Sequence, residues 1–301
     1  MSSGAVVVAS ALDAGLREPP PRAHPVRWTG DYLDAAARRV PSEPARRATV
    51  VGGIAWLTGA LTAVLVGATI ERATRPTPAW LRATVSGVAL WPLLSCRLLV
   101  DETAAVERAL SVDLDAGRAA VSRIVSRDVQ ALSPTQVRAA ALESLAENLS
   151  DSVVAPLAWF AVGGLPAAAL YRFANTADAM WGYRTPRWQH AGRVAARADD
   201  LLNLVPARLT ALLIAGRAVR VGRLRREAHQ TPSPNAGWPM AALALRLDVR
   251  LDKAGSYALN PDGPAPTPTD TEAALRLVRR RAVGIVVATA ALAAVRGRSR
   301  S

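Results

Sequence analysis

The stretch VVGGIAWLTGALTAVLVGATI, from Val50 to Ile70, contains no charged residue over its 21 positions. As an α-helix rising about 1.5 Å per residue, it is long enough to cross the hydrocarbon layer of a bilayer, which is about 30 Å thick. Uncharged runs of this length are uncommon in soluble proteins. The sequence therefore predicts a membrane-spanning helix here; the alternative is a core helix of a soluble bundle.

Further apolar stretches extend the membrane prediction. Ala83 to Val100 is interrupted only by Arg97, whose long side chain can reach the interface, and it is predicted to form a hairpin with the first span. Val153 to Tyr171 contains two prolines and two glycines, so a bent or broken helix is predicted. The weaker stretches 201–215 and 282–295 are predicted to be tilted or partly inserted helices.

The whole chain is predicted to be an all-α, multi-pass integral membrane protein with three to five membrane helices, because no alternating strand pattern persists. Ser133 and Pro134 are typical of a helix start, and 230–237 and 260–268 are predicted loops. One membrane-embedded domain, 1–301, is predicted. Its segments are an N-terminal segment 1–49, a membrane hairpin 50–100, a polar helical segment 101–152, membrane helices with a polar loop 153–220, proline-rich loops and helices 221–281, and an apolar helix with a basic tail 282–301.

The composition agrees with a membrane protein and excludes several functions. Half of the residues are hydrophobic, 20% are charged, and the mean hydropathy is +0.15. Lys253, the single lysine, is followed by alanine, which excludes a Walker-type phosphate loop. The single cysteine, Cys96, excludes an intramolecular disulfide and favours a reducing compartment. Three widely separated histidines give no zinc-ligand spacing.

The formal net charge of +13 indicates an anionic partner. The arginines are spread along the chain without a recognisable nucleic-acid module, so a membrane surface or phosphorylated small molecules are expected and nucleic acid is not. Basic residues flank both ends of the first span, and the positive-inside rule therefore gives little orientation. The apolar run from Ala5 to Leu12 has no basic residue before it and does not resemble a secretory signal.

Three carboxylates recur at helical spacing in the segment ALESLAENLSDS. Glu143, Glu147 and Asp151 are four residues apart and would share one helix face, with Asn148 beside them. Like charges stacked in this way repel one another, so a magnesium ion or a cationic substrate group would account for them. The alternative is a solvated acidic face paired with nearby arginines.

A second polar cluster occurs in YRFANTADAMWGYR. Asn175 and Asp178 are three residues apart and share a helix face, and Arg172 and Arg184 lie on either side of them. Amide, carboxylate and guanidinium groups at the end of an apolar stretch are candidates for substrate binding.

A third cluster lies in RVAARADDLLNLVPARLTA, where the polar residues follow one another at spacings of four and three. These residues are Arg193, Arg197, Asp200 and Asn203. Arg208 follows in an apolar setting, and a buried arginine requires an anionic partner. That partner is either Asp199 or Asp200 within the chain, or a substrate phosphate.

The segment TPSPNAGWPMAALA is stiffened by three prolines. Asn235 permits a tight turn, and Trp238 offers a large flat surface. A proline-rich connector is the structural alternative to a binding loop.

Five segments together resemble the CobD/CbiB family of cobalamin biosynthesis proteins. They are HPVR at His24, ESLAEN at Glu143, YRFANTADAMWGY at Tyr171, ARADDLLNLVPAR at Ala196 and SPNAGWPMAA at Ser233. The resemblance covers most of the chain, from His24 to about Tyr257. Three sites depart from the family pattern. Arg17-Glu18-Pro19 stands in place of Gly-Asp-Pro, Ser152 stands in place of a glycine, and the glycine-rich stretch expected near Tyr257 is reduced to Gly255.

The resemblance implies a multi-pass membrane protein that acts as an adenosylcobinamide-phosphate synthase. Such a protein joins the remaining propionate carboxyl of adenosylcobyric acid to the amine of aminopropanol or of its phosphate. The implied partners are these substrates, the lipid bilayer and other enzymes of the pathway, in the cytoplasmic membrane with the active site facing the cytosol.

The residue chemistry is compatible with such a ligation. A carboxylate does not condense with an amine in neutral water, so activation by ATP with Mg²⁺ is expected. We expect Glu143, Glu147 and Asp151 to hold the metal, with Glu143, Glu147 and Asp178 as catalytic residues, of which Glu147 or Asp178 would accept the ammonium proton. The predicted substrate-binding residues are Asn148, Asn175, Arg184, Arg193, Arg197, Asp200, Asn203, Arg208, Asn235 and Trp238.

Trp238 and Trp181 are candidate surfaces for the flat corrinoid ring, although tryptophan is also common at membrane boundaries. Two other functions stay open. The intramembrane arginines and broken helices also fit a transporter of an anionic metabolite, and a non-catalytic scaffold of the same pathway is the third hypothesis.

Overall fold

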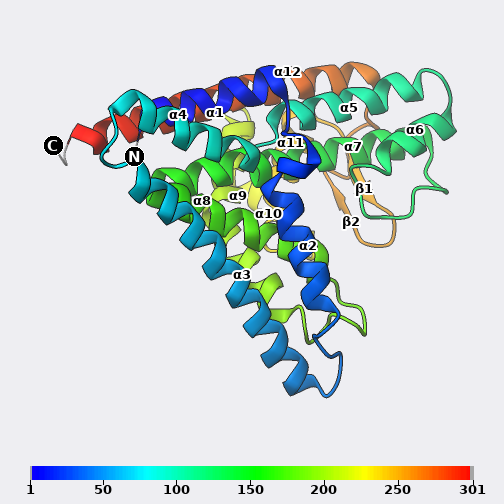
Figure 1. The fold of residues 1–301 in the computed structure, drawn as a ribbon. Coiled ribbons are helices and arrows are strands. Elements are labelled where there is room, and N and C mark those ends of the chain that lie inside the picture. The colour runs from blue at the N-terminus through cyan, green and yellow to red at the C-terminus, as the bar shows by residue number, and fades with distance from the viewer. Residues whose placement is uncertain (1, 299–301) are drawn as a thin grey trace. The chain divides into compact units, whose positions relative to one another are not determined.

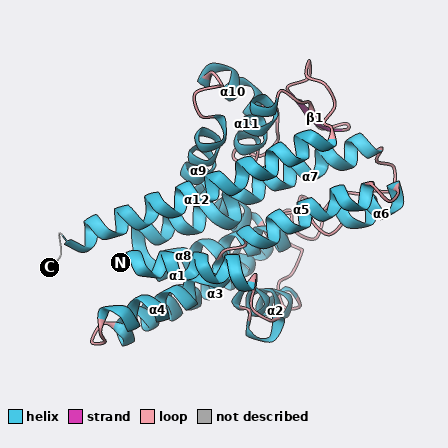
Figure 2. Ribbon diagram, turned by 90° about the horizontal axis from the view of Figure 1, so that it is seen from above, coloured by secondary structure: helices cyan, strands magenta, loops and turns pink. Residues whose placement is uncertain are grey.

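The computed structural model describes residues 2–298, and its secondary structure is almost entirely helical (Figures 1 and 2). In chain order the elements are α1 (Ser3–Leu16), η1 (Pro21–Ala23), α2 (Pro25–Ala37), α3 (Ala45–Thr74), α4 (Ala79–Leu90), η2 (Trp91–Leu93), α5 (Cys96–Leu110), α6 (Leu114–Val121), α7 (Pro134–Leu149), η3 (Ser150–Val154), α8 (Ala155–Trp181), α9 (Arg193–Ala215), α10 (Val221–Ala228), α11 (Gly237–Leu247), β1 (Leu251–Lys253), β2 (Tyr257–Leu259) and α12 (Pro268–Arg298). The η elements are 3₁₀ turns, except that η3 is a π-helical turn. The predicted all-α class is confirmed.

These elements form two compact units, and neither is a continuous piece of chain. Unit 1 contains the described residues 2–95, 155–203 and 285–298, and unit 2 contains Cys96–Val154 and Leu204–Gly284. The chain passes between the units within helices α9 and α12. The predicted single membrane-embedded domain stays a prediction.

Three helical stretches of the described chain are long and apolar enough to cross a membrane. They are Ala45–Thr74, Ala79–Leu110 and Pro134–Trp181, and they contain the three strongest predicted spans. The weaker stretches 201–215 and 282–295 lie in α9 and α12, which are not among the three. Length and composition therefore support a membrane protein.

The second predicted span is not one continuous helix. Helix α4 ends at Leu90, and α5 begins only at Cys96. Pro92 has no N–H to continue the helical hydrogen bonds, and Leu94 has an extended backbone, with φ −104 and ψ 153. The predicted second span, Ala83 to Val100, therefore lies in a candidate membrane-crossing stretch that is interrupted between Leu90 and Cys96.

Small residues allow close helix packing in unit 1. Helix α3 packs along α8 (Figure 1), and a Cβ added at Gly59 would lie 2.3 Å from the Phe173 ring. Helix α1 packs along α4, where a Cβ at Gly87 would lie 2.6 Å from Cβ of Val8. Glycine at such interfaces lets two apolar helices approach and gain dispersion contacts. The N-terminal apolar run is thus a packed helix.

Helix α8 is broken near its middle, as predicted for this stretch. Gly163 and Gly164 have non-helical backbones, and Gly164 has a φ of +69. Pro166 then lies in the first turn of the second half, where its missing N–H costs nothing. The Leu165 N–H donates to the Glu71 carboxylate of α3 at 2.8 Å. Glu71 thus caps the second half of α8.

Replacing Glu71 by alanine should leave the Leu165 N–H without its acceptor. A buried unsatisfied donor costs about 1–3 kcal/mol, so a clear fall in the apparent unfolding midpoint in detergent is expected. Glu71→Gln keeps a carbonyl oxygen in place and should lose markedly less. Equal midpoints for Glu71→Ala and the wild type would show that this cap does not stabilise the break.

Arg17 occupies a backbone conformation that favours glycine. It follows α1 with a φ of 64 and a ψ of −133, where Cβ is crowded. Its N–H donates to the Asp13 carbonyl at 3.0 Å, and its own carbonyl accepts from Trp91 Nε1 at 2.6 Å. This is the position at which the resemblance expects glycine.

Arg17→Gly is expected to stabilise the protein by about 1 kcal/mol, because it relieves the strained φ and keeps both backbone hydrogen bonds. The measurement is again the thermal midpoint in detergent. Arg17→Ala serves as the control, since it removes the same side chain but retains the strain. A midpoint for Arg17→Gly no higher than that of Arg17→Ala would contradict the interpretation.

In unit 2 an ion pair joins helices α5 and α7. Arg138 on α7 donates two hydrogen bonds to the Glu107 carboxylate on α5, from Nη2 at 2.7 Å and from Nε at 2.8 Å. Thr271 on α12 donates to the same carboxylate at 2.9 Å. The predicted start of α7 is confirmed, because Ser133 forms a capping box with Gln136.

A small antiparallel hairpin in unit 2 was not predicted. Leu251 of β1 pairs with Leu259 of β2, and each strand has only three residues. Strands this short contain too few residues for an alternating pattern to be recognised. A hairpin this small leaves the all-α class unchanged.

Candidate functional site: three polar clusters

The acidic motif lies in unit 2, where α7 runs into the π-helical turn η3. Glu143 and Glu147 are on α7, whereas Asp151 is in η3. A π-helical turn is wider than an α-helical one, so Asp151 does not continue the four-residue spacing on the α7 face. Within residues 2–298, no group of three or more acidic, histidine or cysteine side chains could hold a metal ion. The predicted magnesium set of Glu143, Glu147 and Asp151 is therefore not assembled in the described chain.

Glu143 instead belongs to a buried cluster. Its side chain is 2% exposed and forms an ion pair with Arg127, from the segment between α6 and α7. Burial raises the pKa of the Tyr257 phenol, and the negative charge of Glu143 raises that pKa further. The phenol therefore stays protonated at neutral pH. We call Arg127, Glu143 and Tyr257 the Glu143 cluster.

The other two polar residues of the motif differ from Glu143 in exposure. Glu147 is only partly buried, and its charge contributes to the raised pKa of Tyr257, which places it beside the Glu143 cluster. The Asn148 amide donates to the Ser144 carbonyl at 3.0 Å and to its hydroxyl at 3.2 Å, within the same helix. Glu147 is thus the carboxylate of the two on α7 that a solute can reach.

A second cluster, in unit 1, joins two of the predicted motifs. The Asn203 amide donates to both oxygens of the Asp199 carboxylate at 3.0 Å, and the Asn175 amide donates to one of them at 3.3 Å. Tyr171 donates to the Asn203 carbonyl oxygen at 2.9 Å. We call Tyr171, Asn175, Asp199 and Asn203 the Asp199 network. Asn175 and Asn203, predicted separately, thus share one carboxylate.

The Asp199 carboxylate is perturbed electrostatically. Burial raises the pKa of Asp199, the amides of Asn203 and Asn175 partly oppose that shift, and the charge of Asp200 adds to it. Asp199 is only 9% exposed, so water stabilises its charge little. The amides of Asn175 and Asn203 donate to the carboxylate instead. A buried acid with a raised pKa occurs both at functional sites and in structural networks.

The Asp199 network extends toward the HPVR motif through Arg172. Arg172 Nη1 lies 3.4 Å from the Asn175 carbonyl oxygen. The charge of Arg172 also acts on Glu18, which accepts from Ser95 and lies 3.4 Å from His24 Nε2. Burial alone would raise the pKa of Glu18, but these partners lower it below its usual value. Glu18 thus supplies the acid that the resemblance expects at this position.

Asp178 lies against the glycine that follows its helix. A Cβ added at Gly182 would be 1.9 Å from an Asp178 carboxylate oxygen, and the Gly182 N–H donates to the Asp178 carbonyl at 2.7 Å. The carboxylate itself is partly exposed. Only glycine at position 182 leaves room for this placement.

The remaining predicted residues of unit 1 are nearer the surface. Burial raises the pKa of Asp200, and the positive charge of Arg184 opposes that shift, so these two predicted residues are neighbours. Arg193 and Arg197 are exposed on α9. The structure therefore does not place these two arginines in the Asp199 network.

A third cluster, in unit 2, brings together three predicted residues. Arg208 Nη1 donates to the Asn235 carbonyl oxygen at 2.6 Å, and its guanidinium carbon lies 4.9 Å from the centre of the Trp238 ring. Arg208 also donates to the Pro234 carbonyl at 3.1 Å. We call Arg208, Asn235 and Trp238 the Trp238 cluster. The partner of Arg208 is thus an amide and an aromatic face, and neither Asp199 nor Asp200.

Trp181 is not available as a flat surface for a ring. It is 1% exposed, and its ring stacks on Trp188 with centroids 5.2 Å apart. The guanidinium of Arg187 covers Trp188 at 4.3 Å. The proposed contact of Trp181 with a corrinoid is therefore wrong, because the unit 1 core already covers the ring.

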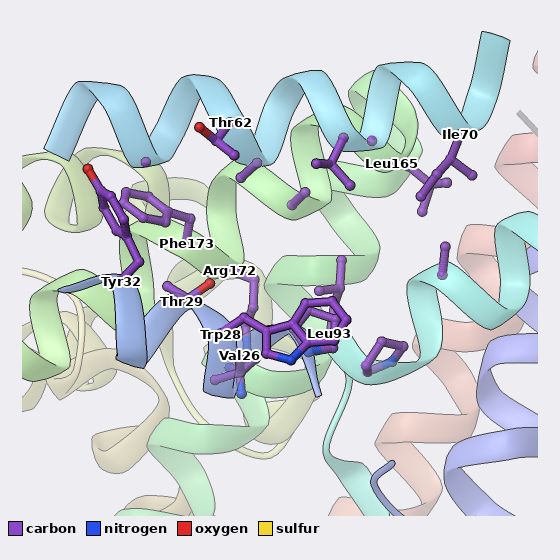
Figure 3. Close-up of a pocket in the computed structure, with 18 of the residues that line it drawn as sticks. Val26, Trp28, Thr29, Tyr32, Thr62, Ile70, Leu93, Leu165, Arg172 and Phe173 are labelled. Carbon is purple, nitrogen blue, oxygen red and sulfur yellow. The ribbon is translucent and has the colours of Figure 1, made fainter. Parts of the chain in front are cut away.

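An apolar cavity of about 460 Å³ lies in unit 1 (Figure 3). Thr62 and Ile70 of α3 line one side, and Trp28 and Leu93 line the other. Arg172 is its one charged lining residue. This lining suits an apolar group better than a phosphorylated substrate.

Sequence reasoning missed Arg127, Tyr257 and Tyr171. Arg127 lies in a loop between helices, and Tyr257 lies on a short strand, far from the acidic motif in sequence. Tyr171 carried one signal, since it opens the YRFANTADAMWGY motif and its hydroxyl needs a partner when buried.

The fold and these clusters define a helical membrane protein with buried carboxylate and amide groups. Burying such groups costs free energy, so their presence indicates a function. The family model described as CobD/Cbib protein matches residues 6–278. The chain therefore belongs to the CobD/CbiB family of cobalamin biosynthesis proteins.

Individual relatives agree with this membership. "Cobalamin biosynthesis protein CobD" of Rhodobacter capsulatus is 39% identical over 94% of this chain and 94% of its own length. "Probable cobalamin biosynthesis protein CobD" of Methanothermobacter thermautotrophicus is 35% identical over 96% of each chain, and that of Thermococcus kodakarensis is 38% identical over 96% of this chain and 95% of its own. No solved structure matches this chain.

Proposed function

We propose that this protein catalyses the amide ligation of cobalamin biosynthesis that joins the propionate carboxyl of adenosylcobyric acid to the amine of aminopropanol or of its phosphate. The observation that carries the proposal is family membership over residues 6–278. The meeting of two predicted residues, Asn175 and Asn203, at the Asp199 carboxylate supports it further.

The reaction requires an activated acid. In the proposed route a propionate oxygen attacks the γ-phosphorus of ATP and ADP leaves, which gives an acyl phosphate. The amine nitrogen then attacks the acyl carbon, phosphate leaves with the electron pair of the broken C–O bond, and the nitrogen loses a proton. ATP, acid and amine thus yield ADP, phosphate and amide.

The protein's own residues would bind the substrates and accept the proton. Glu147 and Asp178 are partly exposed carboxylates, so either is suited to take the proton from the attacking nitrogen. The Glu143 cluster and the Asp199 network would hold their surroundings rigid. Because no three-carboxylate set is assembled, we propose that Mg²⁺ arrives bound to the ATP phosphates.

We further propose that the protein resides in the cytoplasmic membrane with its polar clusters facing the cytosol. The long apolar helices support insertion in a bilayer. ATP is a cytosolic substrate, which supports the orientation. A cysteine-accessibility assay from either side, with Cys96 replaced by serine and single cysteines introduced at exposed positions, would test it.

The experiment is product analysis with the purified protein in detergent. Adenosylcobyric acid is incubated with ATP, Mg²⁺ and either aminopropanol or its phosphate, and the corrinoid products are identified by mass spectrometry. The proposal expects an amide product that requires ATP. Absence of product with both amines, from a protein that retains its helical circular dichroism, would overturn it.

Variants identify the proton acceptor. Glu147→Ala or Asp178→Ala is expected to lower product formation by about 10²-fold or more, and Glu147→Gln or Asp178→Asn should lose as much, because an amide cannot accept the proton. Asp262→Asn is the matched control, because Asp262 is an exposed carboxylate outside the three clusters and the predicted site. Unchanged activity of both carboxylate variants would remove these assignments.

Two other functions give different results in the same preparation. A transporter would move a labelled anionic metabolite into vesicles without forming an amide bond. A scaffold would support the pathway in cells even after Glu147→Ala and Asp178→Ala. Either result in the absence of product would replace the ligase proposal.

A further inference from the structure

A cavity lined by arginines lies in unit 2, apart from the residues of the three clusters. It has a volume of about 550 Å³ and is formed by the turn after α9, by helix α10 and by α11. Arg220, Arg223 and Arg226 line it, together with Gly222. The three arginines are spaced by three residues, so they share one side of the short helix.

The positive charge of this cavity is not balanced by the protein. Residues 216–230 contain five arginines and a single acid, Glu227. The Glu227 carboxylate accepts from the Asn260 N–H at 2.9 Å, and Arg223 donates to the Asn260 side chain at 2.7 Å. Within residues 2–298, no ion pair joins Arg220, Arg223 or Arg226 to a carboxylate. The exposed guanidiniums of Arg220 and Arg226 are therefore available to an external anion, whereas that of Arg223 already donates to Asn260.

The backbone at the same place favours an anion as well. Helix α10 begins at Val221, and Arg220 before it provides no side-chain cap for the first amide groups. Gly222 leaves this approach open, since a Cβ there would meet no atom nearer than the Arg226 Nη1, at 4.0 Å. An oxyanion in the cavity could therefore reach guanidinium and amide donors together.

We infer that this cavity binds the polyphosphate of a soluble ligand, of the nucleoside triphosphate class. Guanidiniums bind phosphate oxygens in pairs, and three of them match a chain of several phosphates better than a single carboxylate. A concave site of this size suits a compact ligand, whereas a bilayer surface would need only a flat basic patch. The inference rests on the proposed function in one respect, namely that the reaction consumes ATP.

The test is equilibrium binding of inorganic triphosphate and of ATP to the full-length protein in a neutral detergent. Arg220→Gln and Arg226→Gln, which lose no protein partner, are each expected to weaken binding by about tenfold. Arg225→Gln is the matched control, because Arg225 lies on the same exposed helix but does not line the cavity. It should bind triphosphate within about twofold of the wild type.

Three results would overturn the inference. They are unchanged affinity in Arg220→Gln and Arg226→Gln, equal weakening by Arg225→Gln, and arginine-dependent binding only of phosphatidylglycerol in nanodiscs with none of triphosphate. The assay needs neither the corrinoid nor the amine. Binding as expected without amide product would therefore contradict the proposed function alone, and ATP-dependent product with unaffected variants would contradict this site alone.

Discussion

Glu143→Ala is expected to lower the free energy of unfolding of unit 2 by about 3–5 kcal/mol, because it leaves the Arg127 guanidinium, whose side chain is only 16% exposed, without its anionic partner. The Tyr257 phenol would lose its charged neighbour at the same time. Unfolding in mixed micelles, followed by hydrogen exchange of α7 and of the β1–β2 hairpin, measures this loss.

Two further variants separate charge from packing. Glu143→Gln keeps the shape but not the charge, and it should still destabilise because Arg127 stays unpaired. The double variant Arg127→Gln with Glu143→Gln should lose less than the sum of the single variants. Additive losses would show that the two side chains do not act as a pair.

Asp199→Ala is the second substitution with a large expected effect. It removes the acceptor shared by the Asn175 and Asn203 amides, and each buried amide left unsatisfied costs about 1–3 kcal/mol. The position of Asn175 would no longer be held, so under the proposed function amide product formation should fall together with stability. A variant with wild-type thermal midpoint and wild-type product yield would contradict this role for the network.

The pH dependence of stability separates the effect of the Asp199 charge from the effect of the side chain's shape. Because burial raises its folded-state pKa, its contribution is fully present below the unfolded pKa of about 3.9 and is lost as pH rises through the folded pKa. Asp199→Asn does not titrate, so the wild type should lose stability relative to this variant over that window. Glu18, whose pKa is lowered, acts in the opposite direction and is common to both proteins.

Much of the fold could be predicted because its signals are local. The uncharged run from Val50 to Ile70 indicated a spanning helix, and the glycines and proline after Val162 indicated the break in α8. The interruption at Pro92 was overlooked because the surrounding residues are as apolar as those of a continuous helix. Hydropathy measures transfer into lipid and contains little information on backbone breaks.

The sequence predicted which residues belong to the clusters, but it predicted only some of the side chains that they contact. Arg208, Asn235 and Trp238 were each proposed for substrate contact, and the fold brings all three together. Glu143 was expected either to hold a metal with Glu147 and Asp151 or to pair with a nearby arginine, and the fold supplies Arg127 to it. Helical spacing predicts which side chains share a face but not what packs against that face.

The amino-acid order by itself determined an apolar helical chain and the polar residues it would expose or bury, because charge, hydrophobicity and turn preference act over a few neighbouring positions. Only the tertiary structure decided that Glu71 caps Leu165, that Tyr257 meets Glu143 and that Asn175 and Asn203 share Asp199. Those contacts join residues far apart in the chain, and their choice depends on how whole helices pack and on which buried polar groups must be satisfied.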